Sequence, residues 1–265
     1  MEHRLYKYMP LRMKFLENFL LRCTPKSSLN DPFEALPSMG YWEQFFEKLS
    51  FCGSGEFSVL KEQYLKDSYE NDFGLDVFKE HGIISFSETH DNLLMWAHYA
   101  DNHSGIVVGF DGNHEWFKTL HRVRYRKERN TEFMDFNDPY LYKSDEWSYE
   151  KEHRLIVKLS STPVQVASKQ YLDSIGCNVA DQSNYIDQKY LIPEHTNADL
   201  SHKDVLCCEK APLENIKSIY VGCKVEPKYI EKIVRCLSDH NLSEVHVFKS
   251  NIDKDNFKLN FERII

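Results

Sequence analysis

Two glutamates separated by one residue, Glu150 and Glu152 in the segment YEKEHRL, have the residue type and spacing for catalysis. Alternate residues of a β-strand point to one face, so a strand here would align both carboxylates with Arg154. The glutamates would then lie about 7 Å apart, at roughly 3.3 Å per residue. Such a pair can grip a ribose hydroxyl and polarise a leaving group, or act as acid and base across a glycosidic bond. The alternative is a surface ion pair between Glu152 and Arg154.

A second candidate is the segment LLMWAHYADNHSGIVVGFD, which begins at Leu93. A helix over about residues 92–100 would turn Trp96 toward the core and His98 nearly the opposite way. We therefore predict that Trp96 is buried and that His98 and Tyr99 face a cleft. The alternative is that His98 and His103 are hydrogen-bonded packing residues. Because no third ligand is near them, we predict no metal site.

Two strand-like segments offer further polar groups. In GIISFSE, alternation places Ser85 and Ser87 on one face, where small hydroxyls would let a ligand approach the sheet closely. In RLYKYM, Lys7 lies on the face opposite Tyr6. A half-exposed strand with polar side chains and a solvated lysine are the alternatives.

Three arginines, Arg122, Arg124 and Arg126, alternate in RVRYRKER. On one strand face they would suffice for a phosphate or nucleic-acid contact, although an exposed basic strand is the simpler interpretation. The chain as a whole has a net charge of -8, which disfavours indiscriminate nucleic-acid binding but not a local basic patch.

The composition is that of a globular protein with a real core, since 42% of its 265 residues are hydrophobic and 28% are charged. Neither the dinucleotide fingerprint GxGxxG nor the phosphate loop GxxxxGK[ST] occurs. Seven cysteines without a CxxC pair indicate free thiols in a reducing compartment. No signal core and no membrane-length apolar run is present. We expect a cytoplasmic protein that does not associate with membranes.

The order of the elements positions these residues. Strands and helices follow one another without regular βαβ alternation, which predicts an α+β fold. We predict one domain over residues 1–265, with a helical insertion at about 41–80 and a strand–helix–strand C-terminal part at about 212–265. LRMKFLENFLLR and SLNDPFEAL have the spacing and start signals of helices. Residues 160–204 are polar and weakly periodic, as in an insertion or a loosely packed edge.

Several segments together resemble a bacterial family, domain-of-unknown-function family 2971. These segments are LYKY, SLNDPFE, ISFSE, LMWAHYADNHSGIVVGFD and KSDEWSYEKEHRL. The resemblance spans Leu5 to Leu159 and, more loosely, the strand IKSIYVG and the helix after it. It implies no activity by itself, because that family has none assigned, but it favours a toxin or phage-defence role.

A second resemblance is to ADP-ribosyltransferases, which hold NAD in the cleft of a split sheet. Their signatures are a basic residue on a first strand, a serine on a second and a glutamate, often in ExE, on a later one. LYKY, ISFS and YEKE are similar in content and order. Lys7 stands where that family has Arg or His, and the family's Ser-Thr-Ser triplet is absent. The resemblance implies a mixed, mainly antiparallel, split sheet with flanking helices.

The same resemblance implies an NAD-dependent ADP-ribosyltransferase with a nucleic-acid or protein acceptor. Its expected catalytic residues are Glu150, Glu152 and His98. The residues expected to bind the NAD cofactor are Tyr6, Lys7, Ser85, Ser87, Tyr99 and Arg154. In this scheme Lys7 meets the pyrophosphate, and Tyr99 or Trp96 stacks on nicotinamide.

Two other functions remain open at this point. One is a metal-independent nuclease in which His98 and His103 act as acid and base and Lys143 or Arg124 neutralises phosphate. The other is a non-catalytic sensor whose aromatic rings, Tyr6, Trp96 and Tyr99, stack on a nucleotide. The sequence leaves the oligomeric state open.

Overall fold

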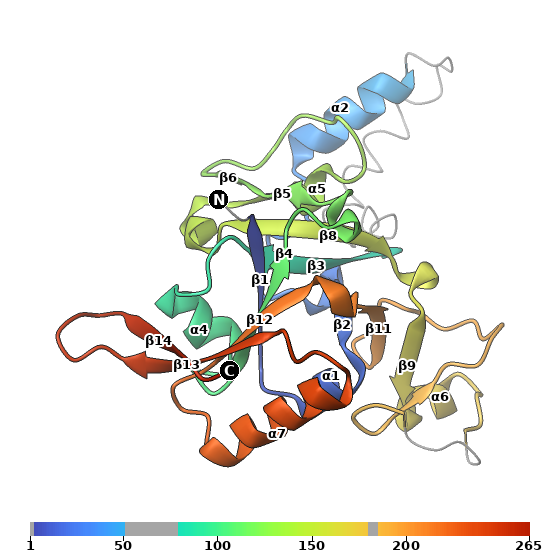
Figure 1. The fold of residues 1–265 in the computed structure, drawn as a ribbon. Helices are drawn as coiled ribbons and strands as arrows, with labels where there is room; N and C mark the ends of the chain where they lie inside the picture. Colours follow the sequence, from blue (N-terminus) through green and yellow to red (C-terminus); the bar gives the residue numbers. More distant parts are fainter. Residues whose placement is uncertain (1–2, 51–78, 180–184) are drawn as a thin grey trace.

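A computed structural model describes residues 3–50, 79–179 and 185–265 of the chain (Figure 1). Its strands are β1 (Arg4–Met9), β2 (Leu20–Pro25), β3 (His81–Ser87), β4 (Ile106–Asp111), β5 (His121–Arg122), β6 (Arg124–Arg126), β7 (Tyr142–Ser144), β8 (Glu152–Lys158), β9 (Val164–Ser168), β10 (Lys189–Leu191), β11 (Val205–Lys210), β12 (Ile216–Val221), β13 (His246–Ile252) and β14 (Leu259–Arg263). Its α-helices are α1 (Met13–Asn18), α2 (Met39–Ser50), α4 (Leu93–Tyr99), α5 (Asp138–Leu141), α6 (Lys169–Ser174) and α7 (Pro227–Asp239).

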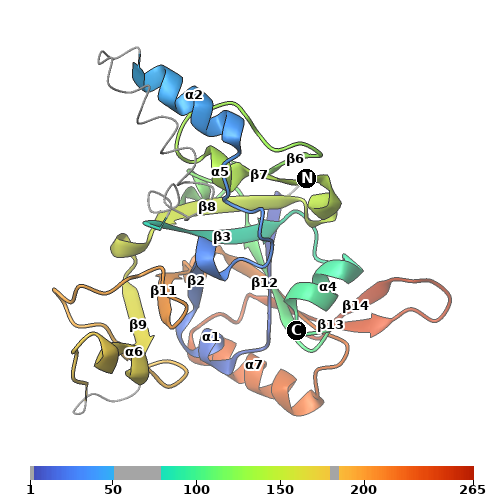
Figure 2. The same cartoon turned by 180° about the vertical axis from the view of Figure 1, so that it is seen from behind.

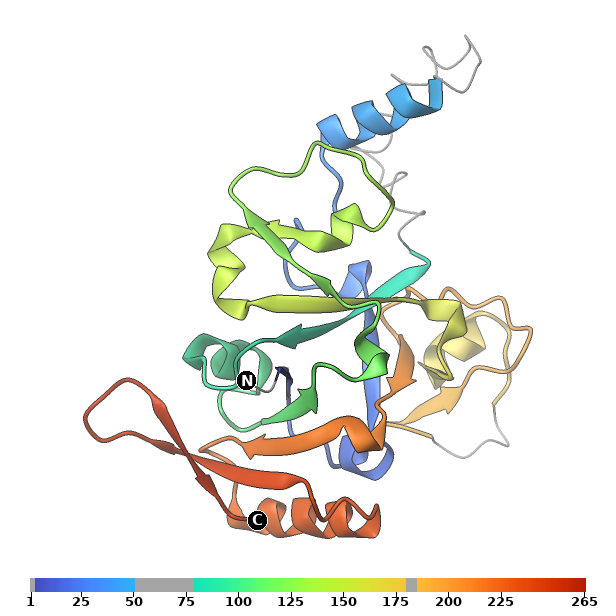
Figure 3. The ribbon, with the colours of Figure 1, turned by 45° about the horizontal axis from the view of Figure 1, so that its top comes forward.

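Most of these strands form one mixed, mainly antiparallel sheet. The order along it is β10-β9-β11-β2-β3-β1-β4-β12-β13-β14, while β8 branches from β3 and pairs on its other edge with β5. Within this sheet only β12 and β13 run parallel, and α7 connects them. Figure 3 shows β8, β3, β4, β12 and β13 following one another from top to bottom. The α+β prediction and the mainly antiparallel sheet are confirmed.

The sheet opens at the middle of β3. One edge of β3 pairs with β8 along its whole length. On the other edge, β1 pairs with the end of β3 at Ser87, whereas β2 pairs with its beginning at Gly82 and Ile83. In the described part of the chain, no strand pairs with Ile84–Phe86 on that edge. The strands β1 and β2 therefore diverge and leave a gap beside the centre of β3.

Apolar side chains cover both faces of the central strands. In β4, Ile106, Val108 and Phe110 join the larger core, and Val107 joins a separate cluster around α4. The helices α1 and α7 lie side by side on the face of the larger core, at the opposite end of the molecule from α2 (Figures 1 and 2). The prediction that the unbroken apolar run IVVGF is a buried strand is confirmed.

Helix α4 is anchored at both ends. The Asn92 side chain caps it by accepting a hydrogen bond from the backbone N–H of Met95 (3.1 Å). Trp96 is fully buried, as predicted, and its ring N–H donates to the carbonyl of His90 (2.7 Å). Gly105 starts the turn into β4, and a Cβ there would collide with the Met9 carbonyl. Only glycine permits this close approach of two backbones.

Of two predicted helices, one is shorter than predicted and the other is a single turn. The pattern over residues 11–22 gives only the short helix α1, because Phe19 adopts a left-handed conformation (φ 54°) and the chain continues as strand β2. The segment after Asp31 forms a single turn, in which the Asp31 side chain accepts from the N–H of Phe33 (2.8 Å). Ala35, with φ of 50°, ends that turn.

The predicted helical insertion, C-terminal part and polar edge segment agree with the structure over the residues that it describes. Helix α2 occupies the start of the predicted helical insertion, and residues 51–78 lie outside the described residues. The predicted strand, helix and two strands at the C-terminus are β12, α7, β13 and β14. Part of the polar segment 160–204 forms the edge of the sheet, as β9 and β10. No described helix has both the length and the apolarity to span a bilayer.

Replacing Trp96 with alanine tests the packing of α4. The side chain is buried and hydrogen-bonded, so Trp96→Ala is expected to lower the free energy of unfolding by about 3–5 kcal/mol. Leu94→Ala on the same helix is the control, because half of that side chain is exposed and its loss should cost under about 1 kcal/mol. Urea unfolding measures both, and equal losses would contradict this packing.

Candidate functional site

A cavity of about 340 Å³ lies at the gap beside β3, and we call it the sheet cavity. It is lined by eight of the nine residues predicted from sequence to act in catalysis or cofactor binding, namely Tyr6, Lys7, Ser85, Ser87, His98, Tyr99, Glu150 and Glu152. These residues come from β1, β3, α4, the 3₁₀-helix before β8 and the start of β8 itself. The divergence of β1 and β2 makes the room that these side chains surround.

The two glutamates reach the cavity in a different way from that predicted. The strand begins only at Glu152, and Glu150 ends a 3₁₀-helix over Asp145–Glu150. Between them Lys151 adopts a left-handed conformation (φ 46°), which reverses the local direction of the chain. The prediction that Glu150 lies on the strand face of Glu152 and Arg154 is therefore wrong. Both carboxylates nevertheless meet the same lysine, because of this turn.

Arg154 binds the carboxylate of Glu152, which lines the cavity. The guanidinium donates from Nε to Oε1 and from Nη2 to Oε2 of Glu152, both at 2.8 Å. It also donates from Nη1 to the carbonyl of Tyr140 (2.6 Å) and from Nη2 to Glu34. Arg154 is fully buried, so the alternative of a surface ion pair is wrong.

Lys143 lies among the three carboxylates. Its Nζ donates to Oε2 of Glu150 at 2.6 Å and lies 3.5 Å from carboxylate oxygens of both Glu152 and Glu34. Lys143 and Arg154 together supply two positive charges to three buried carboxylates. Because burial of an uncompensated charge is costly, one carboxylate of this charge cluster is poised to keep a proton.

The charge cluster drives the pKa values of the two central carboxylates apart. Burial, followed by the charge of Glu152, raises the pKa of Glu150 to about 7 against the opposing effect of Lys143. Burial also disfavours ionisation of Glu152, but Arg154 and Lys143 outweigh it and lower the pKa of Glu152 to about 2. Glu150 can thus exchange a proton near neutral pH, while Glu152 remains an anion. Such a separation is typical of acid–base sites.

Lys7 supplies a further amine on the cavity wall. Its Nζ makes no hydrogen bond or ion pair with any residue in the described ranges. Burial lowers the pKa of Lys7 to about 8, although the negative charge of Glu152 acts the other way. An amine of this kind gains most from an anionic ligand, which would restore its positive charge.

The tyrosine and histidine of α4 differ in their contacts. The hydroxyl of Tyr99 donates to Oε1 of Glu150 (2.5 Å) and accepts from the amide of Asn30 (3.3 Å). His98 is exposed at the edge of the cavity, beside the rings of Trp147 and Tyr149. The prediction that both look toward a cleft agrees with these positions.

His103 lies elsewhere. It lines a different cavity near the β13–β14 hairpin, and its ring is parallel to that of Trp96 at 6.3 Å. His98 and His103 therefore do not form one acid–base pair, and the geometry does not support the nuclease alternative built on them.

The serines of β3 have distinct surroundings. The Ser85 hydroxyl favours the anion of Glu152 through a hydrogen bond. The Ser87 hydroxyl donates to the backbone carbonyl of Glu150 (2.7 Å), so it fixes the end of the 3₁₀-helix. Ile84 and Phe86 point into the core on the opposite face, as the alternation predicts.

Two assignments change with the structure. Arg154 does not line the sheet cavity, and its guanidinium donates to Glu152, Glu34 and a backbone carbonyl, so the structure gives no support to its predicted role in cofactor binding. It positions Glu152 instead. Glu34 and Lys143, which the sequence did not place at the cavity, belong to its wall. Glu34 was interpreted only as part of a helix start, and no spacing rule links it to residue 150.

The arginine row is not one strand. Arg122 lies in β5, which pairs with β8, whereas Arg124 and Arg126 lie in β6, which pairs with β7. All three are exposed. The guanidinium groups of Arg124 and Arg126 lie 5.5 and 4.9 Å from the centre of the Tyr142 ring.

Within the described residues, no group of three or more His, Cys, Asp or Glu side chains is arranged to hold a metal ion. In the charge cluster, Lys143 and Arg154 occupy the space between the carboxylates. Comparison of the chain with protein-family models, curated proteins and solved structures gave no match.

The pKa separation predicts how stability changes with pH. Between about pH 4.5 and 7, folded Glu150 keeps a proton that the unfolded chain has lost, so its contribution to stability falls as pH rises. Glu152 acts oppositely, because its contribution is lost as pH falls from about 4.5 to 2. Glu150→Gln should remove the decrease above pH 4.5 in urea unfolding. An unchanged decrease would contradict the assignment, and Glu146→Gln, an exposed change in the same 3₁₀-helix, is the control.

Proposed function

We propose that the chain transfers ADP-ribose from NAD and that the sheet cavity is its active site. The observation that carries the proposal is that Lys7 of β1, Ser85 of β3 and the glutamates before and at the start of β8 line one cavity. These are the residue types, in the chain order, that resemble the ADP-ribosyltransferase signatures. The position of the cavity where the sheet opens beside β3 also supports the proposed similarity of fold.

The chemical groups of the cavity suit the parts of NAD. The amine of Lys7 makes no hydrogen bond to any residue in the described ranges and suits a pyrophosphate oxygen. Each carboxylate oxygen of Glu150 carries one hydrogen bond, from Tyr99 or Lys143, and retains a lone pair for a ribose hydroxyl. Tyr6, half-buried on the wall, offers an aromatic surface. The volume of about 340 Å³ is within the range of ligand pockets.

The proposed reaction breaks the bond between nicotinamide and the ribose C1′ carbon. The bonding electrons leave with nicotinamide, whose positive ring nitrogen becomes neutral, and positive charge develops on the ribose. The Glu150 and Glu152 carboxylates on the cavity wall stabilise that charge. An acceptor oxygen or nitrogen then bonds to C1′, and its proton passes to Glu150.

The two glutamates have separate roles in this scheme. Glu152 is a permanent anion, because Arg154 binds both of its oxygens. Glu150 has the pKa near 7 that a proton acceptor needs at neutral pH. Lys143 orients Glu150 and limits its basicity, and Tyr99 holds its other oxygen. His98 at the edge of the cavity is placed to meet the acceptor. A toxin or phage-defence role, and membership of family 2971, are parts of the same proposal.

Loss of the Glu150 carboxylate tests the reaction. Glu150→Gln keeps the size and one oxygen acceptor but cannot take a proton, so nicotinamide release from labelled NAD should fall at least about 100-fold. Glu150 is preferable to Glu152 for this test, because Glu152→Gln would leave the buried Arg154 short of negative charge and destabilise the fold.

Glu146→Gln is the matched control, since that exposed side chain lies in the same 3₁₀-helix. It should retain wild-type activity, and both variants should give the same native circular dichroism spectrum. Absence of nicotinamide release and of label transfer in the wild-type protein, supplied with cell extract, would contradict the proposal.

The pH dependence of kcat/KM tests the protonation states required of Glu150 and Lys7. Glu150 must be ionised, so kcat/KM should rise as pH passes about 7, and Lys7 must be protonated, so it should fall above about 8. Lys7→Arg should retain the acidic limb and move the alkaline limb beyond the measurable range, because arginine stays charged. An alkaline limb that is unchanged in Lys7→Arg would exclude this role for Lys7.

A further inference from the structure

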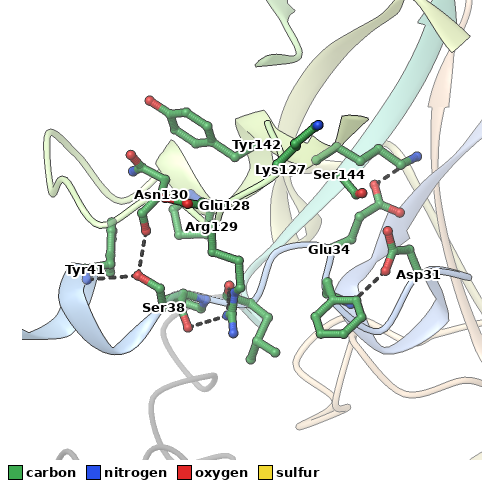
Figure 4. Close-up of a pocket in the computed structure, with 15 residues that line it drawn as sticks. Asp31, Glu34, Ser38, Tyr41, Lys127, Glu128, Arg129, Asn130, Tyr142 and Ser144 are labelled. Carbon is green, nitrogen blue, oxygen red and sulfur yellow. Dashed lines mark hydrogen bonds and ion pairs between the residues drawn. The ribbon is translucent and has the colours of Figure 1, made fainter. Parts of the chain in front are cut away.

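A second cavity, of about 270 Å³, lies on the other side of the Glu34–Lys143 ion pair, and we call it the loop cavity (Figure 4). It lies between the turn after Asp31, the loop over residues 127–130 and the strand β7. Glu34 and Lys143 line both cavities. A ligand in the loop cavity would therefore be separated from the sheet cavity by the thickness of two side chains.

The interior of the loop cavity offers a hydrogen-bond acceptor that the fold does not use. Asp31 is only 6% exposed, and its Oδ1 accepts from the backbone N–H of Phe33. Its Oδ2 has no hydrogen-bonding partner in the described ranges. Because Asp31 lines the cavity, a ligand that displaces water from this oxygen must donate a hydrogen bond in its place. The ligand should accordingly carry an N–H or O–H group at this position.

Positive charge gathers outside the same cavity. Lys127 lines it and is exposed, and Arg124 and Arg126 lie on the strand next to β7. Glu128 is the acidic residue in this row, so the row keeps an excess of positive charge. Because the whole chain carries -8, this local reversal of sign would attract a polyanion to this site in particular.

Two aromatic rings flank the opening. Phe33 lines the cavity and is 62% exposed. Tyr142 lines the opposite part, and the two arginines of β6 hold its ring. An exposed phenylalanine ring and a half-buried tyrosine ring beside a cationic row are components with which proteins bind single-stranded nucleic acid.

We propose that the loop cavity binds one nucleotide of a single-stranded nucleic acid, with the base inside against Asp31 and the phosphates along Arg124, Arg126 and Lys127. We further infer, resting on the proposed function, that the bound nucleic-acid strand is the acceptor of ADP-ribose. The shared wall of Glu34 and Lys143 brings the bound strand next to the sheet cavity.

The same features disfavour an acidic peptide. Its carboxylates could meet the cationic row, but Asp31 and Glu34 would repel any that entered the cavity. A nucleobase instead brings neutral N–H donors to Asp31, and the amino group of cytosine is a donor that carboxylates accept. Thymine presents a carbonyl oxygen at the equivalent position. The site should therefore prefer cytosine to thymine.

The cationic row is tested by fluorescence anisotropy with a short labelled oligodeoxycytidine, in the absence of NAD. The triple variant R124A/R126A/K127A should lower the slope of log affinity against log salt by roughly 2, as expected for three phosphate contacts. The matched control is K228A/K232A, which removes two lysines from helix α7 and should bind as wild type. Equal salt slopes in the triple variant and the wild type would overturn the proposal.

Asp31 is tested with the same probe and a matched oligothymidine. The wild-type protein should bind oligodeoxycytidine roughly tenfold more tightly. Asp31→Asn keeps the oxygen that caps Phe33 but replaces the other with a donor, so the preference should disappear while thermal unfolding stays unchanged. Equal wild-type affinity for the two oligonucleotides, or tighter binding of a polyglutamate peptide, would overturn the proposal. Because NAD is absent, failure of NAD turnover would leave these results intact and would contradict only the proposed reaction.

Discussion

Three buried carboxylates share two buried cations where the sheet opens, and the arrangement of the whole site depends on this imbalance. Within the described residues, the cations that form ion pairs with Glu34, Glu150 and Glu152 are Lys143 and Arg154. The bidentate contact with Arg154 keeps Glu152 ionised, so the excess negative charge is relieved by a proton at Glu150. A ligand that brings its own charge or its own donors to the cavity changes this balance directly, which couples binding to proton transfer.

The same cluster joins segments that are distant in the chain. Glu34 comes from the turn after Asp31, Lys143 from β7, and Arg154 from β8, whose partner β3 forms the floor of the opening. Arg154 also binds the carbonyl of Tyr140 at the end of α5. Each cation thus contacts groups from at least two segments. The charged residues that set the pKa of Glu150 therefore also connect the chain segments around the two cavities.

Local patterns predicted much of this arrangement. Alternation placed Ser85 and Ile84 on opposite faces of β3, and helical spacing buried Trp96, because these features depend only on neighbouring residues. The contribution of Glu34 could not be predicted, since its partner Arg154 is 120 residues away. The conformation of Lys151 was also missed, because a left-handed residue other than glycine leaves no composition signal. Residue types identified the chemistry, whereas the long-range charge balance required the fold.

The central claim is that the charge cluster holds Glu150 between its two protonation states near neutral pH. The most direct measurement is a carbon-13 NMR titration of the glutamate side-chain carboxyl groups, with the Glu150 resonance identified by its absence in Glu150→Gln. The account predicts a midpoint for Glu150 near pH 7, because burial and the neighbouring Glu152 raise its pKa to about that value. A midpoint near 4.5, the ordinary value for a glutamate, would contradict it.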